Sequence, residues 1–262
     1  MNTELLMITA VVLLPIFFIA WRYQQRSKNA GWVDVIWAFG VGSTGVFYAI
    51  VSDGEMLMRV TVASVYGLWF GRLGWHLMQR VKGEPEDSRY AVMRTWANHR
   101  ASMVFLFFYL MQASWVWIFA LPAWLLSDGN NPPLWALVVA IVIFLVAWAG
   151  EALADHQLEL FRREATNKGS TCRQGLWRYS RHPNYFFEWC HWFIYPVLGI
   201  GLAFGWWLWL APVVMFVFLY FVTGIPFSEQ QAIRSRGDDY RHYQRTTSMF
   251  FPWKPKSGSR RP

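Results

Sequence analysis

The chain has 262 residues, of which 55% are apolar, 19% aromatic and only 15% charged. A soluble domain carries about 25% charged residues, so this composition excludes an ordinary soluble domain and indicates a membrane protein. Lys and Arg number 24 and Asp and Glu 16, which gives a net charge of +8. Their placement along the chain explains this charge by membrane topology rather than by nucleic-acid binding.

Seven apolar runs each approach the roughly 20 residues that cross a bilayer as a helix. In chain order they lie at residues 4–21, 32–51, 57–79, 101–127, 134–153, 185–203 and 206–224. We therefore predict an all-α integral membrane protein with seven transmembrane helices. The whole chain, 1–262, is expected to form a single membrane domain, with substrate-pocket helices in 1–130, cofactor-binding helices and loops in 131–253, and a disordered tail at 254–262.

Basic residues concentrate in alternate connections, with three in the first, five in the third, six in the fifth and eight from Arg234 onward. The second, fourth and sixth connections contain no Lys or Arg. Because basic residues accumulate on the cytoplasmic side, this pattern predicts an N-terminus outside and a cytoplasmic C-terminus. The outer connections are short and lack glycosylation sequons, which favours a bacterial inner membrane over the endoplasmic reticulum.

Ionisable residues inside apolar runs are costly in a bilayer and usually face a cavity or a partner. Candidates of this kind are Asp34, Arg72, His76, Glu151, Asp155, Glu188 and His191. Asp34 and Arg72 could simply neutralise each other. Cys172 and Cys190 are the only cysteines, and they support neither a disulfide framework nor a metal site.

The fifth run ends in a polar stripe. Glu151, Asp155 and Arg162 fall within about 40° of one another around a helix axis, on one face. This stripe could be a charged boundary at the membrane surface, or it could hold a polar ligand.

The connection before the sixth run combines cations, hydroxyls and aromatic rings. Arg173 and Arg181 suit bidentate phosphate contact, and Pro183 is well placed to begin a helix. Further residues of this segment suit a nucleotide by hydrogen bonding or ring stacking: Tyr179, His182, Asn184, Tyr185 and Glu188. If this connection were basic only because it lies on the cytoplasmic side, its arginines would be explained. The presence of Glu188 within an apolar helix would not.

Several motifs of the chain resemble those of a known family, the steroid 5-alpha-reductases. The C-terminal part is similar to that family's C-terminal domain in Gly175-Leu176-Trp177-x-Tyr179-Ser180-Arg181-His182-Pro183-Asn184-Tyr185-x-x-Glu188-Trp189, Asp239-Tyr240-x-x-Tyr243 and Phe250-Phe251-Pro252-Trp253. The N-terminal half resembles the family's bacterial branch in Trp32-Val33-Asp34-x-x-Trp37 and Asp87-x-Arg89-Tyr90.

The resemblance implies an NADPH-dependent enzyme that reduces the C4=C5 double bond of a 3-oxo-Δ4 steroid taken from the bilayer. Carried over by position, its cofactor residues are Glu151, Asp155, Arg162, Asn184 and Glu188. Residue chemistry adds Arg173, Tyr179, Arg181, His182 and Tyr185. A C-terminal amphipathic helix beginning near Ser228 could close over the cofactor, with Tyr240 contributing, or Tyr240 could only pack the tail onto the bilayer.

Hydride addition at C5 pushes negative charge onto the C3 oxygen, so a hydrogen-bond donor is needed there. In the family a Glu on the second helix and a Tyr on the third fill this role. The counterpart of the Glu is Asp34, and the third run has no tyrosine after Tyr66. A protonated Asp34 could donate directly, or Asp34 could orient a donor such as His76 or Tyr90.

Two other functions remain open from the sequence. Isoprenylcysteine and phospholipid methyltransferases hold S-adenosylmethionine with a related motif, but usually carry a Glu-Glu pair where this chain has Glu229-Gln230. A non-enzymatic scaffold or lipid-binding protein is the third hypothesis. The expected partners are a steroid and membrane lipid, with no nucleic acid, and the expected state is a monomer.

Overall fold

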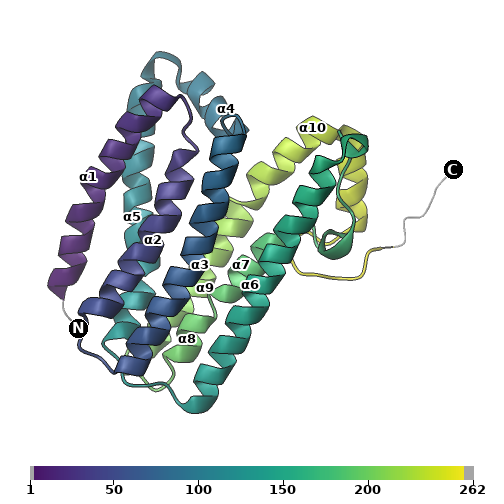
Figure 1. Cartoon of the computed structure of the whole chain (residues 1–262). Helices are drawn as coiled ribbons and strands as arrows, with labels where there is room; N and C mark the ends of the chain where they lie inside the picture. Colours follow the sequence, from purple (N-terminus) through teal and green to yellow (C-terminus); the bar gives the residue numbers. More distant parts are fainter. Residues whose placement is uncertain (1–2, 257–262) are drawn as a thin grey trace. The chain divides into compact units, whose positions relative to one another are not determined.

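The computed structural model describes residues 3–256 of the chain (Figure 1). Regular secondary structure in this part is helical, with no β-strand among the described residues. The prediction of an all-α protein is therefore confirmed. The chain divides into two compact units, one formed by Met1–Pro133 with Gly199–Leu208 and the other by Leu134–Leu198 with Trp209–Pro262.

The first unit is a helix bundle. Its long helices α1 (Thr3–Ser27), α2 (Trp32–Val51), α3 (Met56–Gly83) and α5 (Ala101–Ser127) run side by side in Figure 1. The short helix α4 (Ser88–Ala97) and a 3₁₀ turn (Asn98–Arg100) join α3 to α5.

Close packing of α2, α3 and α5 depends on a fully buried tyrosine, Tyr66. A Cβ atom at Gly45 of α2 would overlap the Tyr66 ring, so only glycine lets the two helices approach this closely. The Tyr66 hydroxyl donates to the carbonyl of Phe119 on α5 at 3.0 Å. Tyr66, the tyrosine that the sequence analysis placed on the third helix, is therefore hydrogen-bonded to the backbone of α5.

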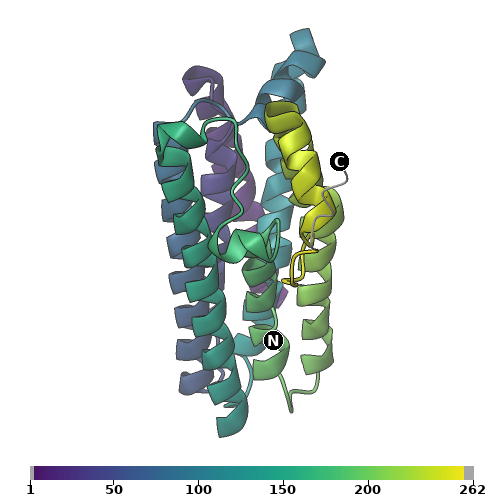
Figure 2. The same cartoon turned by 90° about the vertical axis from the view of Figure 1, so that its right-hand side faces the viewer.

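The second unit begins with α6 (Leu134–Arg163), which packs against α7 (Pro183–His191) and α8 (Ile194–Leu198). The connection from α6 to α7 contains 3₁₀ turns at Ala165–Asn167 and Gly175–Arg178 and folds back along the end of α6 (Figure 2). After a 3₁₀ turn at Gly205–Trp209, most of which belongs to the first unit, the second unit continues with α9 (Leu210–Val217), a π-helical turn (Phe218–Val222) and α10 (Ile225–Thr246).

Five helical stretches are long and apolar enough to cross a membrane: Thr3–Ser27, Trp32–Val51, Ser88–Ser127, Leu134–Arg163 and Gly205–Thr246. This is the pattern of a multi-pass membrane protein. The five stretches contain the first, second, fourth, fifth and seventh of the expected runs. The third expected run is one 28-residue helix, α3, which carries four basic residues and is not among the five.

The sixth expected run, 185–203, is not one continuous helix. It is divided into α7 and α8, with Trp192 and Phe193 between them bonded to carbonyls only three residues earlier. Pro196 accounts for the break, because it has no N–H to donate to the Trp192 carbonyl and its ring would clash with that carbonyl in a continuous α-helix.

The expected disordered tail, 254–262, lies mostly outside the described residues, which end at 256. Within the described part, the backbone N–H of Lys256 donates to the carbonyl of Thr246 at 2.8 Å. The N–H of Trp253 donates to the carbonyl of Tyr179 at 2.9 Å. The last described residues are therefore hydrogen-bonded to the second unit.

Candidate functional site

Asp34 lies in the first turn of α2, where a negative charge is favoured by the helix dipole. The Tyr90 hydroxyl donates to its Oδ1 at 2.7 Å, and Arg89 Nη2 donates to its Oδ2 at 3.2 Å. An aspartate that accepts on both oxygens, once from a guanidinium, has the hydrogen bonding of an ionised carboxylate. The first unit thus holds a carboxylate–tyrosine pair backed by an arginine.

Asp87 holds Arg89 in place. It caps α4 by accepting the backbone N–H of Arg89 at 2.9 Å, and it also accepts from Arg89 Nε at 3.1 Å and from Arg80 Nη2 at 2.9 Å. Burial raises the pKa of Asp87, but the charges and hydrogen bonds of Arg89 and Arg80 outweigh it and hold the pKa below its usual value. The charges alternate from Arg80 through Asp87 and Arg89 to Asp34.

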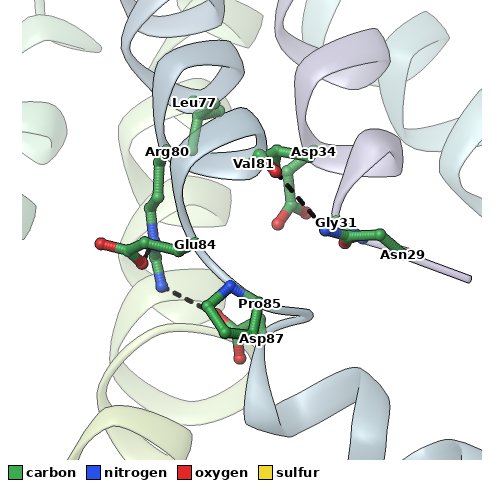
Figure 3. A pocket seen from close by; sticks show the side chains of 9 residues that line it. All are labelled: Asn29, Gly31, Asp34, Leu77, Arg80, Val81, Glu84, Pro85 and Asp87. Carbon is green, nitrogen blue, oxygen red and sulfur yellow. Dashed lines mark hydrogen bonds and ion pairs between the residues drawn. The ribbon is translucent and has the colours of Figure 1, made fainter. Parts of the chain in front are cut away.

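A small pocket lies beside this network (Figure 3). The Asp34 carboxylate and the Arg80–Asp87 ion pair are both in its wall. Its volume is about 20 Å³, enough to hold a water molecule with several polar neighbours. The residues that line it are Asn29, Gly31, Asp34, Leu77, Arg80, Val81, Glu84, Pro85 and Asp87.

Of the two donors suggested for Asp34, the fold brings Tyr90 to it. Tyr90 is buried and hydrogen-bonded to Asp34, whereas His76 lies on an exposed position of α3. The guanidinium of Arg72, proposed as a neutralising partner, lies over the Trp69 ring at 5.5 Å, and the ion pair of Asp34 is with Arg89.

The predicted cofactor residues of the second unit gather in part on α6 and α7. Asn184 Nδ2 donates to Asp155 Oδ1 at 3.2 Å, so the two helices meet at these residues. Glu188 lies one turn after Asn184 and accepts from Trp192 Nε1 at 3.0 Å. Glu151 is buried on α6, one turn before Asp155.

The remaining predicted contacts lie at the edges of this unit. Arg162 is exposed at the end of α6. Arg173 is paired with Asp239 at 2.6 Å, and Tyr179 has 42% of its surface exposed. Tyr185 stacks on His182, with ring centroids 5.5 Å apart and planes inclined by 6°.

Three residues expected to contact a cofactor instead surround Glu229 of α10. Arg181 Nε, His182 Nε2 and the Tyr240 hydroxyl donate to Glu229 Oε1 at 2.8, 3.0 and 2.8 Å. Arg181 Nη2 donates to Oε2 at 3.2 Å, and the Gln244 amide donates to the same oxygen. In this structure the polar atoms of Arg181 are occupied by the protein itself, not held open for a phosphate.

Arg181 also caps the end of α10. Its Nη1 donates to the carbonyls of Gln244 and Thr247 at 3.0 and 2.8 Å, and its backbone N–H donates to the carbonyl of Ser248 at 2.9 Å. The last carbonyls of a helix lack helical partners and carry partial negative charge. One buried cation therefore satisfies both a carboxylate and a helix end.

The profile of one protein family, described as a protein of unknown function (DUF1295), matches residues 20–247. The chain belongs to the DUF1295 family. No curated protein and no solved structure matches the chain significantly. The DUF1295 match includes both the Asp34–Tyr90 pair and the residues around Glu229.

The sequence gives Asp87 and Arg89 no role beyond the Asp87-x-Arg89-Tyr90 motif, and it places Glu229 only on the amphipathic segment near Ser228. The N-cap role of Asp87 could have been found from local rules, because an aspartate directly before a helix is a typical N-cap. Glu229 had no local signal of this strength. Its partners Arg181 and His182 stand 48 and 47 residues earlier in the chain.

His182 gives this DUF1295 protein a testable pH dependence. Burial lowers the pKa of His182 below its ordinary value of 6.5, and the hydrogen bond and charge of Glu229 oppose this shift without cancelling it. Below pH 6.5 the unfolded chain therefore binds a proton that the folded protein resists, so the free energy of unfolding decreases as pH falls.

We expect the melting temperature in detergent to fall between pH 7.5 and 5.5, and to fall less in a His182→Gln variant. His242→Gln, which changes an exposed histidine of α10, should keep the wild-type slope. Equal slopes in all three proteins would contradict the assignment of this titration to His182.

Proposed function

We propose that this protein is an NADPH-dependent reductase of the C4=C5 double bond of 3-oxo-Δ4 steroids. The observation that carries the proposal is the 2.7 Å hydrogen bond from the Tyr90 hydroxyl to Asp34. It pairs an acid with a phenol, the combination needed at a carbonyl oxygen that gains negative charge. The aspartate stands where the reductase family has a glutamate, and the tyrosine comes from α4 instead of the third helix.

Asp34 and Tyr90 can move a proton to the substrate in linked steps. Asp34, held as a carboxylate by Arg89, positions the Tyr90 hydroxyl, and Tyr90 donates its hydroxyl proton to the C3 oxygen. The tyrosinate that this leaves takes up one proton from solvent, which restores the hydroxyl. The enol product gains a proton at C4 and loses one from oxygen, so one proton from water is consumed with each hydride.

The residues of α6 and α7 suit a nicotinamide dinucleotide by their chemistry. Asn184 offers an amide, and Asp155 and Glu188 offer carboxylates for ribose hydroxyls or a carboxamide. The end of α6 and the connection to α7 carry three exposed cations that suit phosphate groups: Arg162, Lys168 and Arg178. When bound, NADPH would supply the hydride that adds at C5.

The proposal also includes the number of membrane spans and their orientation. Adding α3 and the broken α7–α8 segment to the five apolar stretches gives seven spans. With basic connections on the cytoplasmic side, the N-terminus would lie outside and the C-terminus inside. We propose a bacterial inner membrane as the location, with a steroid entering from the bilayer.

The decisive experiment follows NADPH absorbance with the full-length protein in detergent, with and without progesterone or testosterone. We expect oxidation that requires the enone, and a loss of most of it in an Asn184→Ala variant. Asn130→Ala, which changes an exposed asparagine of the connection between α5 and α6, serves as the matched control and should keep wild-type rates.

Another outcome of this experiment would favour the methyltransferase alternative. If NADPH neither binds nor is consumed, while S-adenosylmethionine raises the melting temperature, the reductase proposal is wrong. The methyltransferase alternative would then take its place.

A further inference from the structure

The carboxylate of Glu229 is saturated by donors from the protein. It lies on α10 with 8% of its residue surface exposed, and five donor atoms reach its two oxygens, from Arg181, His182, Tyr240 and Gln244. An ionised carboxylate has about four lone-pair positions. Glu229 therefore has no capacity left for a ligand, and any role it has in function must act through its partners.

Those partners are the residues directly before α7. His182 occupies the N-cap position of α7, and Pro183 begins the helix. The backbone N–H of His182 donates to Ser180 Oγ at 3.1 Å, and Ser180 Oγ donates to the carbonyl of Phe250 at 2.8 Å. The start of α7 is thus fixed from α10 and from the segment that follows it.

Asn184 and Glu188 lie on the first turns of α7, two and six residues after His182. A shift of the Arg181–His182 backbone would move both side chains, because a helix moves as a rigid element. The ion pair with Arg181 is buried, at 8% and 11% side-chain exposure, so water cannot replace either partner without cost.

We propose that Glu229 is a positioning residue that holds the start of α7, and with it Asn184 and Glu188, in the orientation that binds the dinucleotide. This inference rests on the proposed function. It predicts an effect confined to the cofactor, because the proton-donating residues Asp34 and Tyr90 belong to the other unit and make no hydrogen bond to Glu229 among the interactions described for residues 3–256.

The test compares Glu229→Gln, which keeps the side-chain size but loses the charge, with Asp238→Asn. Asp238 is on the same helix with 95% of its side chain exposed, paired only with Arg241 in the described structure. We expect the KM for NADPH to rise at least about tenfold in Glu229→Gln, the effect of losing a hydrogen bond to a charged group. The kcat at saturating NADPH and the KM for steroid should stay within about twofold, and Asp238→Asn should match wild type.

Two further measurements keep the inference testable if Glu229→Gln folds poorly. Tyr240→Phe removes one donor and leaves the ion pair, and should raise the KM for NADPH about threefold. Hydrogen exchange of residues 177–182 should be faster in both variants, and unchanged in Asp238→Asn, whether or not a cofactor is present.

An unchanged KM for NADPH in both Glu229→Gln and Tyr240→Phe would overturn the positioning role, even with faster exchange, because Glu229 would then be structural only. An equal fall in kcat with KM unaltered would also overturn it. Failure of the proposed function is distinguished by the wild-type protein, which would then not oxidise NADPH at all, and the positioning role would fail with it.

Discussion

Replacing Tyr90 with phenylalanine is expected to lower kcat for steroid-dependent NADPH oxidation by about 10²–10³-fold, the usual effect of removing one donor to a developing oxyanion. The substitution removes only the hydroxyl that donates to Asp34 at 2.7 Å. The KM for NADPH should not change, since the cofactor residues lie on other helices. Initial rates at varied steroid and NADPH concentrations would measure both constants.

Tyr23→Phe is the matched control for this variant. Tyr23 lies on α1 with 50% of its surface exposed, and its ring packs edge-on against Trp32. Removing its hydroxyl should leave kcat unaltered. Equal activity in Tyr90→Phe and Tyr23→Phe would show that Tyr90 is not the donor, and the Asp34–Tyr90 pair would lose its chemical role.

Arg181→Met is expected to destabilise the protein by about 3–5 kcal/mol, because it leaves a buried carboxylate without its cation. Methionine fills similar space but donates no hydrogen bond to Glu229 or to the last carbonyls of α10. For a chain of this size the melting temperature should fall by about 6–20 °C. Intrinsic tryptophan fluorescence during heating in detergent would follow the transition.

Arg178→Met provides the comparison, since Arg178 lies on the same connection but is exposed. Its melting temperature should stay close to that of wild type, because a solvent-exposed charge contributes little to stability. A similar fall in both variants would show that the loss of stability does not come from the buried Arg181–Glu229 pair.

The positions of most helices were predicted correctly, because they depend on the local pattern of apolar residues. Apolar runs near a bilayer's width correspond to helices at α1, α2, α3, α5 and α6. The apolar pattern did not predict the break in the sixth run, because Pro196 interrupts the helical hydrogen bonding without ending the apolar run of residues 185–203.

For the predicted cofactor residues of the second unit, the sequence indicated the types of residue better than the contacts they make. Asp155, Asn184 and Glu188 were expected on neighbouring helices, and Asn184 does meet Asp155. Arg181 was expected to contact phosphate because a guanidinium suits bidentate binding, and His182 because it can donate and accept hydrogen bonds. In the structure both are buried against Glu229. Burial of a cation cannot be read from its neighbours in sequence.

The amino-acid sequence alone determined that this protein is all-helical and has the apolar stretches of a multi-pass membrane protein. These properties depend on the apolar content of about 20 consecutive residues within one helix. Only the tertiary structure decided that Asp34 meets Tyr90 and that Glu229 meets Arg181, residues 56 and 48 positions apart. Such contacts depend on how helices pack and where the chain turns back, which the spacing of residues along the sequence does not specify.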